Sequence, residues 1–131
     1  MRPNELMIGD YVRFKHGIDK VVGVSWVPGL GDCAWFAASA TLFPESVEDV
    51  NPIPLTPEIL ENNGFEKSKM YEVWKIICDE YELRVTPWRV AIIFLDEDGA
   101  DKEEFSMPRP KYVHQLQHAL RLCGIEKEIV L

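Results

Sequence analysis

The sequence predicts a fold of the α+β class, and three patterns along its 131 residues support that prediction. Residues 19–26 alternate between two sets of side chains, as they do in a β-strand with one buried side. Residues 89–95 repeat the strand pattern with a longer apolar run. Residues 110–123 gather their apolar side chains on one face of a helical wheel. Several strand segments and one amphipathic helix together indicate α+β.

The first part of the chain is expected to form a small β-barrel of the SH3-like kind. Strands are predicted at 11–14 and 19–26, followed by a Pro- and Gly-rich turn at 27–32. Composition alone allows 33–39 and 40–43 to be two short strands or one helix. The regular spacing of about 8–12 residues between strands favours two strands. Successive short strands that close on themselves would make the barrel.

Residues 51–65 predict a short linking helix. Three prolines exclude a central strand in this segment. Thr56 can cap the helix, Pro57 suits its first turn, Glu58 favours its positive end, and Gly64 suits its end.

The remaining residues predict a sheet that is packed by one helix. Strands are expected at 70–78, 81–85, 89–95 and 103–107, with a hairpin turn at 96–101, a helix from Pro110 to Gly124, and a short terminal strand at 127–131. We therefore expect residues 1–131 to form a single compact unit, with possible halves at 1–55 and 56–131.

The predicted C-terminal helix also carries the candidate binding residues. Its apolar face contains Tyr112, Val113, Leu116, Ala119, Leu120 and Cys123, and its polar face contains His114, Gln117, His118 and Arg121. We expect the apolar stripe to pack on the sheet and the polar side to face water. His114 and His118 are four residues apart, a spacing that can hold zinc, but no third ligand or adjacent Glu is evident. The polar face is thus either a contact surface or merely solvated.

Cys33 offers an alternative as the nucleophile of a small cysteine hydrolase. The segment "GLGDCAWFAASATL" resembles the nucleophile region of calpain-like cysteine proteases, where the thiolate begins a helix and His114 would act as its base. The chain has about half the length that such a domain requires, Ala34 separates the Cys from the Trp, and no side chain is identifiable as orienting the His. A buried structural Cys33 is the favoured interpretation.

The charge of the chain excludes several classes of function. The net charge is −8, and residues 45–61 and 96–104 are strongly acidic. This field disfavours nucleic-acid binding through a broad basic face. No nucleotide-binding or EF-hand spacing occurs, no run reaches the ~20 apolar residues of a membrane span, and the three cysteines form no C-x-x-C pair. We expect a cytoplasmic protein without a cofactor.

Three phrases, "ELMIGDYV", "NPIPLTPEILENNGFEK" and "KYVHQLQHAL", carry a resemblance that covers almost the whole chain. They resemble a set of small uncharacterised proteins encoded by phages, prophages and other mobile elements of gut Bacteroidales bacteria. The chain departs from that pattern at "HALRLCGIEKE", where the family has an aromatic-rich segment. The resemblance implies a setting in a mobile element and no particular activity.

These observations predict a non-catalytic interaction protein, accessory to a phage or mobile element, that binds an unknown protein partner. The expected contact surface is His114, Gln117, His118 and Arg121, joined by Tyr11 and Trp26 if these aromatics are exposed. The cysteine hydrolase and a metal site at His114 and His118 are the alternatives.

Overall fold

The computed structural model describes residues 1, 5–15, 17–37, 44–69, 71–78, 80–95 and 101–131. Within these residues it confirms the α+β class, with two five-stranded antiparallel sheets and one main helix. The chain folds into two compact units, residues 1–54 with 112–122 and residues 55–111 with 123–131. No helix in the described part of the chain is long and apolar enough to cross a membrane.

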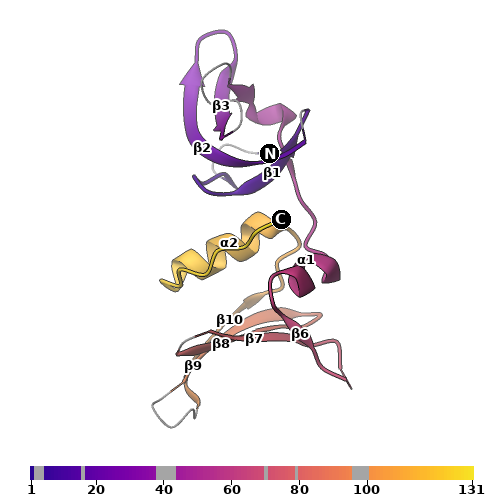
Figure 1. The fold of residues 1–131 in the computed structure, drawn as a ribbon. Coiled ribbons are helices and arrows are strands. Elements are labelled where there is room, and N and C mark those ends of the chain that lie inside the picture. The colour runs from indigo at the N-terminus through magenta and orange to yellow at the C-terminus, as the bar shows by residue number, and fades with distance from the viewer. Residues whose placement is uncertain (2–4, 16, 38–43, 70, 79, 96–100) are drawn as a thin grey trace. The chain divides into compact units, whose positions relative to one another are not determined.

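The sheet of the first unit has the strand order β4-β3-β2-β1-β5. Its strands β1, β2 and β3 are labelled in Figure 1. Its elements are β1 (Tyr11–Phe14), β2 (Gly17–Val27), β3 (Gly31–Phe36), β4 (Glu45–Ser46), the 3₁₀ turn η2 (Val47–Asp49) and β5 (Asn51–Pro52). β2 is long enough to pair with two neighbours, because residues 17–20 pair with β1 and residues 21–27 with β3.

The strands predicted at 11–14 and 19–26 are confirmed, and 33–36 form a strand rather than a helix. The strand predicted at 40–43 lies outside the described residues. Strand pairing does not close the sheet among the residues described, so the SH3-like barrel stays a prediction.

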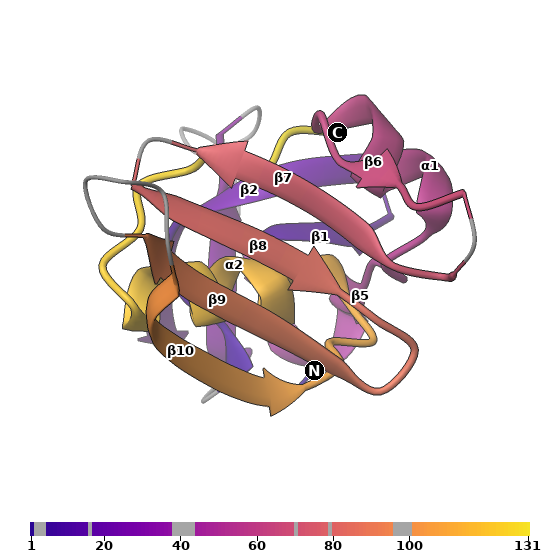
Figure 2. The same ribbon diagram turned by 90° about the horizontal axis from the view of Figure 1, so that it is seen from below.

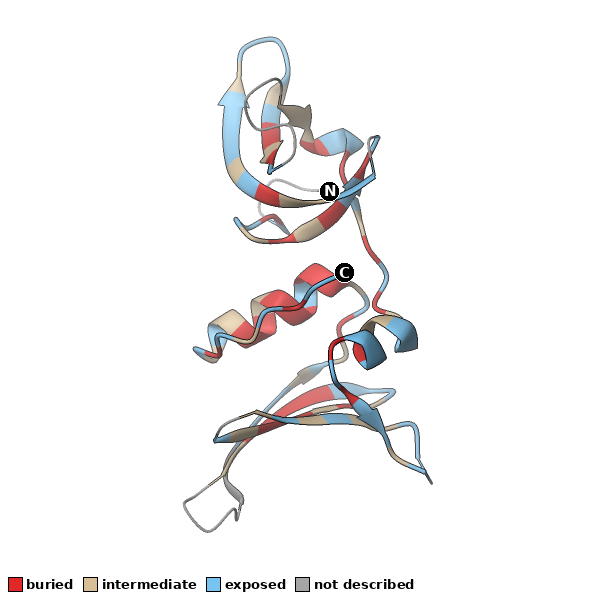
Figure 3. Cartoon of the chain, in the orientation of Figure 1, coloured by how far each residue is buried: buried red, intermediate tan, exposed pale blue. Residues whose placement is uncertain are grey.

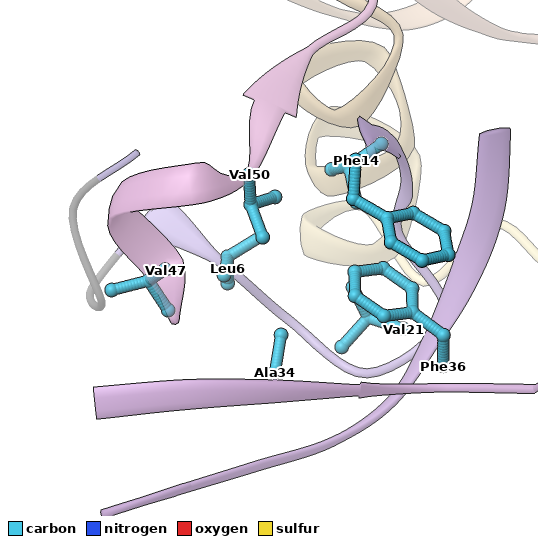
Figure 4. Packing of buried hydrophobic residues seen from close by; sticks show 8 residues of the cluster. Leu6, Phe14, Val21, Ala34, Phe36, Val47 and Val50 are labelled. Carbon is cyan, nitrogen blue, oxygen red and sulfur yellow. The ribbon is translucent and has the colours of Figure 1, made fainter. Parts of the chain in front are cut away.

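The first unit has an aromatic core. Phe14 and Phe36 stack in parallel, with ring centroids 4.1 Å apart and planes inclined by 2° (Figure 4). Side chains alternate between the two faces of a strand, which directs Val12 and Phe14 to the same side of β1. The full cluster contains Leu6, Val12, Phe14, Val21, Ala34, Phe36, Val47 and Val50.

The helix α2 (Val113–Leu122) belongs to the first unit, although the sequence placed it in the second half. Gln115 Oε1 accepts the Tyr112 N–H at 3.2 Å, as in one half of a capping box. The Val113 N–H donates to Ile53 O at 2.8 Å, which fixes the start of the helix beside the end of β5. The predicted apolar face is confirmed for four residues, since Val113, Leu116, Ala119 and Leu120 are buried. Figure 3 shows that much of α2 has the colour of buried residues.

The sheet of the second unit has the order β10-β9-β8-β7-β6 (Figure 2). Its strands are β6 (Glu66–Lys67), β7 (Trp74–Cys78), β8 (Tyr81–Val85), β9 (Arg89–Leu95) and β10 (Asp101–Pro108). The strand predicted at 70–78 begins at Trp74. The other three predicted strands of this half are confirmed, whereas most of the predicted hairpin turn, residues 96–100, lies outside the described residues.

The helix α1 (Pro57–Asn62) confirms the predicted linking helix, because Thr56 Oγ1 accepts the Ile59 N–H at 3.3 Å and Gly64 follows at φ 87°. The terminal strand predicted at 127–131 is wrong. The side-chain amide of Asn63 takes the place of a pairing strand. It donates to Val130 O at 2.8 Å and accepts the Val130 N–H at 2.9 Å.

Candidate functional site

Asp10 is at the centre of the polar contacts that α2 makes within the first unit. Its side chain is 0% exposed. The Met7 N–H donates to Oδ2 at 2.8 Å, His118 Nε2 lies 2.8 Å from the same oxygen, and Arg121 Nη1 donates to Oδ1 at 2.8 Å. A buried carboxylate requires such partners because an unpaired buried charge costs several kcal/mol. Asp10 therefore ties the segment before β1 to the polar side of α2.

A tight turn before β1 positions this carboxylate. The Asp10 N–H donates to Met7 O at 3.1 Å, and the Gly9 N–H donates to Val21 O at 2.7 Å. Gly9 has φ 95°, and a Cβ there would lie 2.9 Å from Arg121 Nη2. Both the positive φ and the close approach of the guanidinium therefore require glycine. Asp10 was missed in the sequence, where Gly9-Asp10 inside "ELMIGDYV" was its only signal.

Gln117 pairs with the backbone on either side of Asp10. Its Nε2 donates to Gly9 O at 3.0 Å, and its Oε1 accepts the Tyr11 N–H at 3.1 Å. The amide thus replaces the strand that this part of the backbone would otherwise need, and both of its polar atoms are satisfied. The buried position of Gln117 follows from these two bonds.

His114 is buried on the same side of α2. Its ring stacks on Tyr112 at a centroid distance of 5.9 Å and meets the ring of His118 edge-on at 5.4 Å. Burial lowers the pKa of His114 and outweighs the opposing effect of the Asp10 carboxylate. Its Nδ1 is buried with no hydrogen-bond partner in the part of the chain that the structure describes. The imidazole is accordingly neutral at neutral pH.

The expectation that the polar face of α2 is solvated is wrong for His114 and Gln117, which are both buried. His118 and Arg121 keep side-chain exposures of 28% and 32%, and both are bound to Asp10. Gln117 can be buried because the backbone at Gly9 and Tyr11 satisfies both of its polar atoms, whereas His114 is buried as a neutral ring against Tyr112 and His118. Binding of a partner by His118 and Arg121 stays a prediction.

The two alternative functions were a metal site at His114 and His118 and a cysteine hydrolase that uses Cys33 and His114. Among described residues, no group of three or more His, Cys, Asp or Glu side chains could hold a metal ion at His114 and His118. Cys33 lies buried within β3, where its Sγ donates to Gly31 O at 3.5 Å. Burial raises the pKa of the Cys33 thiol, and the nearby Asp32 and Glu45 carboxylates raise it further. Because Cys33 lies in a strand, no helix N-terminus is present at this residue to stabilise its thiolate.

Trp26 lies on the hairpin of β2 and β3 and is 67% exposed. Val24 pairs with Ala34, and Trp26 pairs with Asp32. Paired residues of antiparallel strands share a face. Because Ala34 belongs to the core, Val24 and Trp26 extend the core-facing side of the hairpin beyond the core itself.

Tyr11, the second aromatic predicted at the contact surface, is half-buried. Lys20 Nζ lies 5.2 Å from the centre of its ring. Of the two predicted aromatics, Trp26 is therefore the one whose side chain is open to a partner.

Comparison with known proteins gives no further assignment. No family model, no curated protein and no solved structure matches the chain.

Proposed function

We propose that this chain is a non-catalytic protein-interaction module that serves a phage or mobile element in the cytoplasm of its host. The observation that carries the proposal is the exposed Trp26, on a hairpin whose apolar face continues past the core. Tryptophan is strongly enriched among the residues that dominate interface energies. The mobile-element setting rests on the resemblance of the three phrases to Bacteroidales proteins, and the net charge of −8 opposes a role on DNA.

An SH3-like barrel is the scaffold that we propose for the first unit. Three features favour it: β5 pairs with β1, η2 joins β4 to β5, and β2 is shared by two partner strands. Such a scaffold holds the hairpin rigidly and leaves its outer end available for a partner. The scaffold by itself implies no activity.

The partner is proposed to bind by adding a strand to β2. In the described part of the chain, residues 22–27 of β2 pair only with β3, since β1 reaches no further than Lys20. The other edge of this segment therefore presents backbone N–H and C=O groups, and such edges receive strands from partner proteins. Main-chain hydrogen bonds would supply affinity, and Trp26 would supply the apolar anchor.

The chemistry of the hairpin selects the kind of strand that would bind. Asp32 is exposed and lies directly across from Trp26, so a basic residue next to an apolar one complements this surface. Two copies of a chain with a net charge of −8 repel each other, which favours a different protein over a second copy. The proposed partner is a protein with an extended, apolar segment that includes Lys or Arg.

Photo-crosslinking followed by titration tests the proposal. A photoreactive amino acid at position 26 should capture a partner in host cells that carry the element, whereas the same group at the exposed Leu122 should not. The partner is then purified and titrated by calorimetry. Trp26→Ala should raise its Kd at least tenfold, about 1.4 kcal/mol, and Leu122→Ala should leave the Kd within about twofold.

Equal Kd values for the parent and Trp26→Ala would contradict the proposed surface. If the purified chain self-associates and Trp26→Ala abolishes this, the partner would be a second copy of the chain and not a different protein. If the chain changes the gel mobility of duplex DNA at physiological salt, the proposed class of function itself would be overturned.

A further inference from the structure

A groove of about 570 Å³ opens at one end of the sheet of the second unit. One wall is the turn between β8 and β9, with Pro87 and Trp88, and the other is the segment before β7, with Tyr71 and Val73. These walls are neighbours because β7 and β8 pair in antiparallel fashion. The volume is within the range of known ligand pockets, about 300–1,000 Å³.

The two aromatic rings of the groove are open to solvent. Trp88 is 82% exposed and Tyr71 is 68% exposed. The indole N–H of Trp88 makes no hydrogen bond to any described residue, so it can donate to a ligand carbonyl. Exposed aromatic rings beside an open donor are typical of sites that bind extended peptides.

The backbone that carries Trp88 is held in place by hydrogen bonds. Thr86 Oγ1 accepts the N–H groups of Trp88 at 3.3 Å and Arg89 at 3.1 Å. The Arg109 N–H donates to Trp88 O at 3.0 Å, and Arg109 Nη1 donates to Thr86 O at 3.0 Å. The ring is thus presented from a fixed turn, which lowers the entropy cost of binding.

The groove lining carries one acidic and one basic side chain, Glu72 and Arg89. Arg89 Nη1 lies 3.0 Å from Glu104 Oε1, so its charge is balanced within the sheet. Glu72 lines the groove and forms no ion pair with any described residue. The unbalanced carboxylate favours a ligand with a Lys or Arg side chain.

The residues that line the groove favour one of the common modes of peptide recognition over the others. Its walls are a turn and a strand connection rather than an open strand edge, which disfavours strand addition. Its Arg89 is already paired, which disfavours a phosphorylated peptide. A proline-rich segment suits short aromatic grooves because the polyproline conformation is preformed and leaves its carbonyls free to accept hydrogen bonds.

We propose that this groove binds an extended proline-rich segment of another protein, with its prolines against Trp88 and Tyr71 and a Lys or Arg beside Glu72. The inference goes beyond the proposed function, because it concerns a different surface, in the other unit, and a different mode of binding. Either site can fail its test without affecting the other.

A peptide titration tests the proposal with the full chain. The probe is a peptide with an N-terminal Arg followed by repeats of Pro-Pro-Leu, and NMR follows the indole N–H signal of Trp88, assigned by its loss in Trp88→Phe. We expect saturable movement of this signal with a Kd below about 1 mM. For the variants, the titration is followed by backbone amide signals of the groove residues instead: Trp88→Ala should raise the Kd at least tenfold, and the matched Trp26→Ala should leave it unchanged.

The charge is tested separately. Glu72→Gln should lower the affinity for the Arg peptide severalfold, so that the chain no longer binds it more tightly than a peptide that begins with Glu. Glu61→Gln on α1 should change neither property. Failure of the Arg peptide to saturate the Trp88 signal would overturn the proposal. Equal binding of a peptide with Ala in place of every Pro, or Trp88-dependent dimerisation in sedimentation, would also overturn it.

Discussion

Replacement of Asp10 by Asn removes a buried charge and keeps the shape of the side chain. Breaking a buried ion pair costs about 3–5 kcal/mol when the remaining charge stays buried. His118 and Arg121 keep exposures of 28% and 32%, so water solvates part of the charge that Asp10→Asn leaves behind. We therefore expect a loss near the lower limit, about 3 kcal/mol, out of the roughly 5–15 kcal/mol that stabilise a domain.

Guanidinium chloride unfolding monitored by tryptophan fluorescence measures this loss. Asp32→Asn, at an exposed position, is the matched control and should change the free energy of unfolding by less than about 0.5 kcal/mol. The double variant Asp10→Asn/Arg121→Met should lose about 1–2 kcal/mol less free energy of unfolding than the two single variants lose together. The reason is that both changes remove the same contact. A loss below about 1 kcal/mol, or additive effects, would refute the assigned role of Asp10.

Three further predictions follow from buried residues of the first unit. Because burial lowers the pKa of His114, the folded state binds fewer protons than the unfolded one below about pH 6.5, so the free energy of unfolding should fall as the pH drops from 6.5. Urea unfolding at several pH values gives the free energy of unfolding as a function of pH. In His114→Gln this pH dependence should be weaker below pH 6.5, and an unchanged pH dependence would contradict the prediction. Cys33 should react with a thiol reagent only after unfolding, and rapid labelling of the native chain that His114→Ala abolishes would favour the hydrolase instead. Phe36→Ala should cost about 3–5 kcal/mol in the same unfolding assay, and a cost below about 1 kcal/mol would show that the stack with Phe14 is unimportant.

Local patterns in the sequence were sufficient for most of the elements. Alternation of side chains located β2, a longer apolar run located β9, and the capping residues Thr56 and Gly64 located α1 within a few residues. These signals are short-range, because hydrophobic periodicity and caps are properties of one segment. The terminal segment failed for the same reason, since its partner is the amide of the distant Asn63.

The polar face of α2 could not be interpreted from the helix alone. A helical wheel shows which side chains are polar but not what lies opposite them. Gln117 and Arg121 are bound to Gly9, Asp10 and Tyr11, more than a hundred residues earlier in the chain. Only the structure brings these partners together, and it shows that His114 and Gln117 are buried while His118 and Arg121 stay partly exposed.

Exposure of individual aromatics was also outside the reach of the sequence. Trp26 was predicted only conditionally, because alternation does not show where the core ends along a strand. Trp88 lies in a turn that periodicity does not describe, so the groove in the second unit gave no sequence signal beyond the neighbouring Pro87 and Trp88. Both surfaces became visible only when exposure could be compared with strand register.

Hydrogen exchange of the backbone amides tests the proposed strand addition most directly. The free chain and its complex with the captured partner are compared by mass spectrometry after peptic digestion. Strand addition predicts slower exchange of alternate amides within residues 22–27 of β2, and unchanged exchange in β1, whose two edges are already paired with β2 and β5. Unchanged exchange of residues 22–27 in a saturated complex would contradict the account.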